Sequence, residues 1–247
     1  MMEYSPKEQQ YCTGCEKDLC VGCVQETIAL SYEGRLLKSN KPRYEAFHWE
    51  DLDRFRAYLG DDVDPLKHGM YQAKEIAIPF IEFQNTFDGY TDFTQEQAKM
   101  LIIGNVLHDL HEGITGDIPE PDKNHQTAVD ELEVNLECVK NVLHPSKEWL
   151  EAYRAVVGDI EGWSFAGRAF NAIERCGYFL SGVKAWNLRN HNELDDDEKA
   201  QSRAMGFGCI ERQAPHLLEL GKEFAYCWWL IKANETAVKQ VVGDYGR

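Results

Sequence analysis

The stretch Gly104–Lys123 reads GNVLHDLHEGITGDIPEPDK. It starts as the end of a helix and finishes in a turn punctuated by Gly and Pro. His108 and Asp109 are adjacent, and Glu112 follows His108 by four residues. Positions i and i+4 share one face of a helix, so we expect His108 and Glu112 to point the same way. The same geometry points His111 away from them, and we assign it no role. This face is the best candidate for chemistry in the chain.

Helical patterns surround this stretch from about residue 43 onward. Thr94 and Gln97 form a capping box that opens the helix running through His108. An earlier helix starts at Asp64–Pro65, carries His68 and is expected to kink at Pro79. Further helices are predicted over residues 124–143, 146–158, 166–188 and 204–241, the last of them broken near Pro215. No run alternates with a period of two, so the sequence predicts an all-α protein.

Composition narrows the classes of function. The chain has 247 residues and a net charge of −16, from 42 acidic against 26 basic residues. Proteins that bind nucleic-acid polymers usually carry a basic face, so we expect no such partner. The longest apolar runs fall short of the roughly 18 residues that a membrane span needs. The N-terminus has neither the basic nor the apolar region of a signal peptide, so we expect a cytoplasmic protein with no membrane partner.

Residues 1–40 form a Cys-rich extension ahead of a helical domain over residues 41–247. Four cysteines have the spacing C-x2-C-x4-C-x2-C: Cys12, Cys15, Cys20 and Cys23. In a reducing compartment, paired CxxC units more often bind metal than form disulfides. The four-residue spacer is shorter than in common zinc ribbons. The paired CxxC units favour a structural zinc, while the short spacer leaves an iron–sulfur cluster open, and a redox pair and free thiols also stay open.

The block HDLHEGITGDIPEPDK, residues 108–123, resembles the HD-domain phosphohydrolases, in particular the branch that contains the bacterial 5'-deoxynucleotidases. Their pattern is HD-x-x-E-x-x-T-G-D-[LI]-P-x-P-x-K. His68, in LKHGMYQAKEIA, is similar in place to the first metal-binding His of that family. The dipeptide Arg54–Phe55 resembles an Arg-Trp pair that the family places over the nucleotide. The likeness covers roughly residues 50–235 and leaves out the Cys-rich extension.

The resemblance implies an HD-type helical bundle, often a homodimer, that hydrolyses a nucleotide phosphate with a divalent metal such as Mn, Co, Mg, Zn or Fe. It also implies a role for each matching residue. The metal ligands would be His68, His108 and Asp109. Glu112 would orient or deprotonate the attacking water, and Asp117 would contact the sugar. Substrate contacts would come from Arg54, Phe55 and Lys123, with Arg54 and Lys123 meeting phosphate oxygens.

The sequence departs from the family pattern at the fourth ligand. That ligand is an Asp on a late helix, and the matching stretch here, RAFNAIERCGYFLSG, places Asn171 at its position. A neutral amide oxygen should hold a divalent cation less tightly than a carboxylate. Three outcomes are open. Asn171 serves as a weaker ligand, a carboxylate of Glu174 or Asp159 substitutes for it, or the site has lost its metal.

Three functions compete on these observations. The favoured one is a phosphatase for (deoxy)nucleoside 5'-monophosphates, with a deoxynucleoside triphosphate triphosphohydrolase as a variant. The second is a catalytically degenerate HD fold that binds a nucleotide or a protein. The third makes the four-cysteine cluster a redox or iron–sulfur sensor that gates the helical domain.

Overall fold

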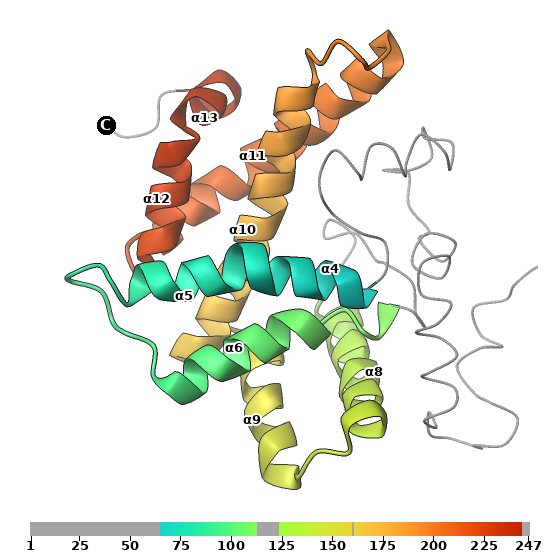
Figure 1. Cartoon of the computed structure of the whole chain (residues 1–247), viewed down its shortest axis with the longest axis vertical. Coiled ribbons are helices and arrows are strands. Elements are labelled where there is room, and N and C mark those ends of the chain that lie inside the picture. The colour runs from blue at the N-terminus through green and yellow to red at the C-terminus, as the bar shows by residue number, and fades with distance from the viewer. Residues whose placement is uncertain (1–64, 113–123, 160, 244–247) are drawn as a thin grey trace, which may run out of the picture. The chain divides into compact units, whose positions relative to one another are not determined.

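The computed structural model describes residues 65–112, 124–159 and 161–243 (Figure 1). All regular secondary structure within these ranges is helical, which confirms the all-α class for this part of the chain. None of its helices is long and apolar enough to cross a bilayer. The domain boundary expected at residue 40 lies outside the described ranges. So do several residues with predicted roles: Cys12, Cys15, Cys20, Cys23, Arg54, Phe55, Asp117 and Lys123.

The described chain divides into two compact units. The first takes residues up to Ala73 and Met100–Gly167, and the second takes Lys74–Lys99 and the residues from Arg168 onward. In chain order the elements are α4 (Pro65–Gln72), the π-helical segment η2 (Ala73–Ala77), α5 (Ile78–Gln84), α6 (Gln95–Leu107), α8 (His125–Leu143), α9 (Lys147–Val157), α10 (Phe165–Leu188), α11 (Asp196–Leu220), α12 (Ala225–Ala233) and α13 (Glu235–Val242).

The irregularity expected at Pro79 takes the form of a π-helical turn. Proline has no N–H to donate a hydrogen bond to the carbonyl four residues earlier, and its ring crowds that carbonyl. The chain widens into η2, which ends two residues before Pro79, and then resumes as α5, which contains Pro79. The irregularity is therefore a local change of helix type, with η2 directly after α4 and α5 directly after η2 in the sequence.

Helix α6 starts where the sequence predicts and ends earlier than expected. Thr94 N donates to Gln97 Oε1 at 3.0 Å and Gln97 N donates to Thr94 Oγ1 at 3.2 Å, which forms the capping box. The helix stops at Leu107, so His108 lies in the turn that follows. In that turn Glu112 N donates to Asp109 O, and not to His108 O four residues back. The prediction that His108 and Glu112 share a helix face is therefore wrong.

Helices α8 and α9 agree to within one residue at each end with the ranges that the sequence predicts. Asn124 accepts a hydrogen bond from Thr127 N and begins α8, and His144 ends it in a left-handed conformation at φ 46°. Ser146 accepts from Trp149 N at the start of α9. The two helices pack on the end of α6 and form the core of the first unit, whose fully or nearly buried members are Leu107, Leu110, Leu136, Cys138, Val139 and Tyr153.

The last predicted helix is three helices, and its break lies after Pro215. Pro215 stays inside α11, and the break comes at residues 221–224. Gln84 of α5 holds this break. Its Nε2 donates to Glu223 O at 3.0 Å, and its Oε1 accepts from Ala225 N at 2.9 Å. A fully buried amide thus satisfies backbone groups that a continuous helix would pair internally. The predicted break near Pro215 is wrong, because α11 runs through Pro215 to Leu220.

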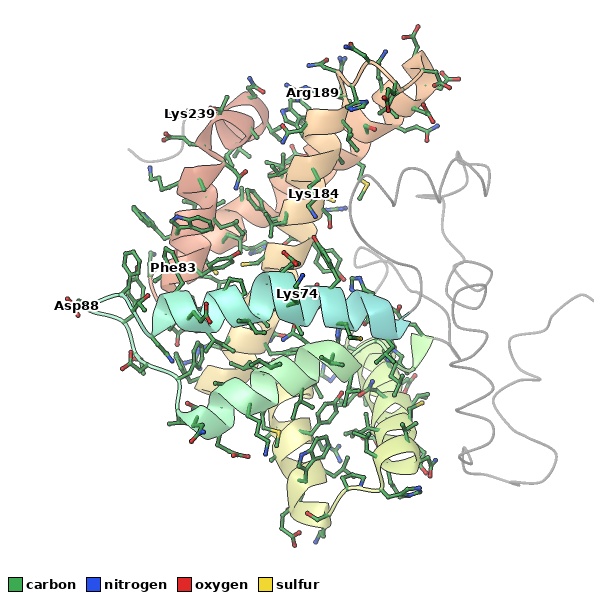
Figure 2. The ribbon with its side chains drawn as sticks, in the orientation of Figure 1. Lys74, Phe83, Asp88, Lys184, Arg189 and Lys239 are labelled. Atoms are coloured by element: carbon green, nitrogen blue, oxygen red, sulfur yellow. The ribbon has the colours of Figure 1, made fainter. Side chains whose placement is uncertain are left out.

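Aromatic rings form the core of the second unit. Phe80 is fully buried, and its ring centroid lies 5.3 Å from that of Phe224 and 5.8 Å from that of Tyr226. Phe83, labelled on α5 in Figure 2, packs against Phe87 and Trp229. These contacts join α5 to α12, which is the role that buried aromatic residues at helical spacing usually have.

Asp159 supports the turn that leads into α10. Its carboxylate accepts hydrogen bonds from Trp163 N at 2.8 Å and Ser164 N at 2.6 Å. Burial alone would raise the pKa of this carboxyl, but the hydrogen bonds from Ser164 and Trp163 outweigh burial and lower the pKa below its ordinary 3.8. The residue that the sequence offered as a substitute metal ligand is thus engaged by two backbone N–H groups.

This lowered pKa predicts how Asp159 contributes to stability. We expect Asp159→Ala to lower the free energy of unfolding by about 1 kcal/mol at neutral pH, because hydrogen-bond acceptors are lost. Asp159→Asn keeps an acceptor and removes the charge. Since the folded-state pKa is lowered, the charge stabilises the fold above pH 3.8, and this contribution is lost as the pH falls further. Urea unfolding at pH 6 and pH 3 measures it: the advantage of wild type over Asp159→Asn should shrink at pH 3, and a constant difference would contradict the assignment.

Candidate metal centre

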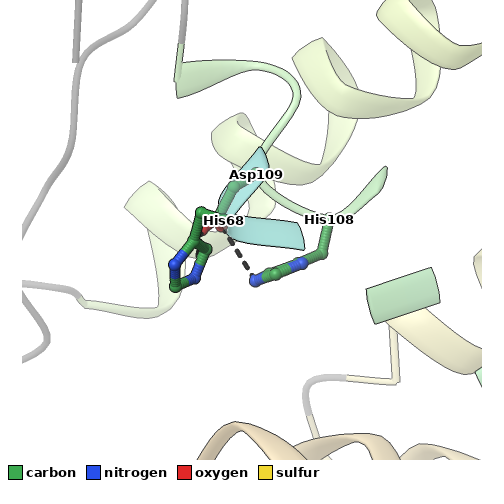
Figure 3. A group of neighbouring side chains, drawn as sticks. All are labelled: His68, His108 and Asp109. Carbon is green, nitrogen blue, oxygen red and sulfur yellow. Dashed lines mark ion pairs between the residues drawn. The ribbon is translucent and has the colours of Figure 1, made fainter. Parts of the chain in front are cut away.

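Three predicted ligands come together in the first unit (Figure 3). His68 comes from α4, and His108 and Asp109 come from the turn after α6. His68 Nε2 lies 3.5 Å from Asp109 Oδ2, and His108 Nε2 lies 3.2 Å from Asp109 Oδ1. One ligand atom from each of the three residues lies within 4.8 Å of the others. Residues forty positions apart in the sequence therefore present two imidazole nitrogens and a carboxylate to one point.

A glycine beside His68 allows this convergence. Gly69 packs directly on the end of α6, where a Cβ atom would lie 2.1 Å from Val106 O and 2.9 Å from Asn105 O. Only a residue without a side chain can make that approach. The close contact between the backbones of α4 and α6 brings the ring centroids of His68 and His108 to 5.9 Å.

The ring of His108 is oriented by the backbone of the preceding helix, α6. His108 Nδ1 lies 2.9 Å from Asn105 O. A carbonyl oxygen can only accept, so Nδ1 must carry a proton and donate it. In the neutral imidazole this leaves the lone pair on Nε2, the nitrogen that faces Asp109. Metal-binding histidines are commonly fixed in this way, with the second ring nitrogen donating to a backbone carbonyl.

The next two residues of the motif are buried. Glu112 is 2% exposed and His111 is 4% exposed. His111 Nδ1 lies 3.0 Å from His108 O, and its Nε2 lies 3.8 Å from Glu131 Oε1 on α8. The expectation that His111 points away from His108 rested on a continuous helix, and α6 ends at Leu107. His111 contacts the backbone of a predicted ligand.

The other predicted ligand lies in the second unit. Asn171 and its neighbour Glu174 are half-buried on α10. The predicted set of four is thus represented by three residues that meet within one unit and by Asn171 on a helix of the other.

Two buried polar residues of α8 contact the motif and were not predicted from the sequence, Glu131 and Asn135. A signal for Asn135 exists in the sequence. With Leu132, Leu136 and Val139 it falls on one face of the helix, and a polar side chain on an apolar face needs a partner. The pattern could have marked the residue, but its partner could be found only in three dimensions.

The chemistry of the three donors fits a divalent transition metal. Imidazole nitrogens and a carboxylate oxygen suit Zn, Fe, Mn and Co, and three protein donors leave coordination positions open, as catalytic sites require. The side chains of His68, His108 and Asp109 are 15%, 9% and 12% exposed, so the site is largely shielded from water. Comparisons with protein-family models, with curated proteins and with solved structures found no match to this chain.

Proposed function

We propose that this chain is a metal-dependent phosphohydrolase of the HD-domain type, and that its substrate is a (deoxy)nucleoside 5'-monophosphate. The observation that supports the proposal is the convergence of His68, His108 and Asp109. These are the residues that the HD resemblance named as ligands. A bound divalent cation would supply Lewis-acid activation of a phosphate ester, which is the chemistry that such a donor set serves.

In this proposal the chain's own residues divide the work. His68, His108 and Asp109 hold the cation, and the hydrogen bond from His108 Nδ1 to Asn105 O fixes the ligating nitrogen. Glu112, buried three residues after Asp109, orients the attacking water or takes its proton. Asp117 contacts the sugar. As the resemblance implies, Phe55 would lie with Arg54 over the nucleotide, and Arg54 and Lys123 would bind phosphate oxygens.

A phosphate-release screen tests the activity. We expect the protein to release inorganic phosphate from nucleoside 5'-monophosphates when Mn²⁺ or Co²⁺ is supplied, and to stop when a chelator removes the metal. Release of triphosphate from a deoxynucleoside triphosphate would identify the triphosphohydrolase variant in its place. The proposal fails if the protein binds metal at this site and releases no phosphate from any nucleotide.

Asn171 motivates the second candidate, a degenerate HD fold that binds a nucleotide or a protein partner without hydrolysis. The loss of a carboxylate at this position is specific and can be reversed by Asn171→Asp. An inactive wild type and an active Asn171→Asp variant would favour the degenerate fold. Activity in wild type that His108→Ala abolishes would favour the enzyme.

The four-cysteine cluster supports a separate proposal, a structural zinc site at Cys12, Cys15, Cys20 and Cys23. An absorption spectrum of protein purified without oxygen distinguishes it from an iron–sulfur cluster. Visible absorbance would favour the sensor function. About one zinc per chain in colourless protein, retained in a His108→Ala variant, would favour a structural role.

A further inference from the structure

Two backbone carbonyls at the end of α6 accept hydrogen bonds from a side chain of α8. Asn135 Nδ2 donates to Leu107 O at 2.7 Å and to His108 O at 2.9 Å. His111 Nδ1 is the second donor to His108 O. The carbonyl of a predicted metal ligand therefore accepts from two side chains.

These bonds replace the ones that a helix would make. If α6 continued, Leu107 O would accept from His111 N and His108 O would accept from Glu112 N. In the structure Leu110 N donates to Leu107 O and Glu112 N donates to Asp109 O, both across three residues. The amide of Asn135 thus takes the place of the helical donors. The chain leaves the helix in the turn that carries His108 and Asp109.

The Asn135 amide is itself held from α9. Tyr153 OH donates to Asn135 Oδ1 at 2.8 Å. Tyr153 is fully buried and Asn135 is 2% exposed. Because the two carbonyls can only accept, this is the one orientation of the amide that satisfies all three partners. Burial, followed by the negative charge of Asp109, raises the pKa of Tyr153 well above its ordinary value of 10.0, so the phenol stays a donor.

We propose that Asn135, held by Tyr153, is the positioning residue that ends α6 at Leu107 and sets the turn in which His108 and Asp109 face His68. The proposal rests on the proposed metal centre and adds residues from two further helices to it. Neither Asn135 nor Tyr153 is placed among the ligands. They act on the centre through the backbone of His108, as outer partners of metal ligands commonly do.

The test measures Co²⁺ affinity in the 247-residue chain by visible absorption. A His108→Ala variant, which keeps the cysteine cluster, gives the signal to subtract. We expect Asn135→Ala to weaken Co²⁺ binding at this site about 10- to 100-fold and to change its absorption bands, because the ligand geometry changes. Tyr153→Phe removes only a hydroxyl and keeps the packing of the ring. It should shift affinity in the same direction by a smaller factor.

A matched control separates positioning from general stability. Val156 is buried on the same helix as Tyr153, and Val156→Ala removes two methyl groups without touching the hydrogen-bonded chain. This variant should lose thermal stability and keep both Co²⁺ affinity and spectrum.

Equal affinities and spectra in wild type, Tyr153→Phe and Asn135→Ala would overturn the positioning proposal alone. If wild type binds no more Co²⁺ than His108→Ala does, the proposed metal centre is overturned, and the positioning proposal with it. Metal binding without phosphatase activity would overturn only the proposed reaction.

Discussion

His108→Ala is expected to lower the affinity for a divalent cation at this site by more than about 100-fold and to reduce phosphate release to background. The loss of a single outer partner of a metal ligand costs about 10- to 100-fold in affinity, so the loss of a ligand should cost more. His108 supplies one of three donors, and its Nε2 is the atom closest to Asp109 among the two histidines. Its removal leaves His68 and Asp109, too few donors to hold a cation in a defined geometry.

Thermal unfolding gives a readout of this loss that does not depend on substrate. A ligand that binds only the folded state, at 100 times its Kd, stabilises a protein by about 2.7 kcal/mol. Wild type should show this gain with Mn²⁺ or Co²⁺, and His108→Ala should not. The control is His216→Ala, which replaces an exposed histidine of α11. If added metal stabilises His108→Ala and His216→Ala equally, then His68, His108 and Asp109 form an ion-pair cluster and not a metal centre.

Local sequence signals were sufficient to predict where a helix starts when an N-cap residue sets that start. Asn124, Ser146 and Thr94 are good N-caps in any context, because each accepts a bond from a nearby backbone N–H, and the starts of α8, α9 and α6 follow from them. The three residues that converge were also predictable as candidate ligands, since the HD block and its upstream His are a pattern of residue types. What the pattern predicted is a set of residues, and the structure adds that their donor atoms meet.

The sequence was insufficient where a side chain from a distant helix takes over backbone groups. The ends of α6 and α11 are two such cases. Asn135 binds the carbonyls of Leu107 and His108, and Gln84 binds the backbone of Glu223 and Ala225. Nothing in the residues around His108 indicates that the helix stops there. A buried amide that arrives from elsewhere can outweigh local helical preference, because an unpaired buried polar group is more costly than an irregular turn.

Gly69→Ala is expected to destabilise the fold and to weaken the proposed metal centre, although the same change at an ordinary helical position stabilises. In a helix interior, Ala is favoured over Gly by about 1 kcal/mol. At Gly69 the new Cβ would lie 2.1 Å from Val106 O, where real contacts are 3.0 Å or longer, so the backbones of α4 and α6 must separate. Overpacking of this kind costs about 1–3 kcal/mol, and the fixed backbone here places the cost toward the upper end.

The separation would act directly on the three candidate ligands. His68 is the residue before Gly69, while His108 and Asp109 follow the stretch of α6 that the new Cβ would strike. Metal sites need their donors within about 0.5 Å of the productive geometry, so a shift between α4 and α6 should cost affinity as well as stability. Co²⁺ titration and urea unfolding on the same preparation measure both quantities.

Gly208→Ala is the matched control for this prediction. Gly208 also lies inside a helix, α11, but a Cβ there would meet no described heavy atom within 4 Å. That variant should gain about 0.5–1 kcal/mol in the free energy of unfolding and keep its Co²⁺ affinity. The two identical substitutions should therefore differ in the sign of their effect on stability, and only one of them should affect the metal. A gain of stability at Gly69 equal to that at Gly208 would mean that α4 does not press on α6, and the convergence of His68 with His108 and Asp109 would lose its structural basis.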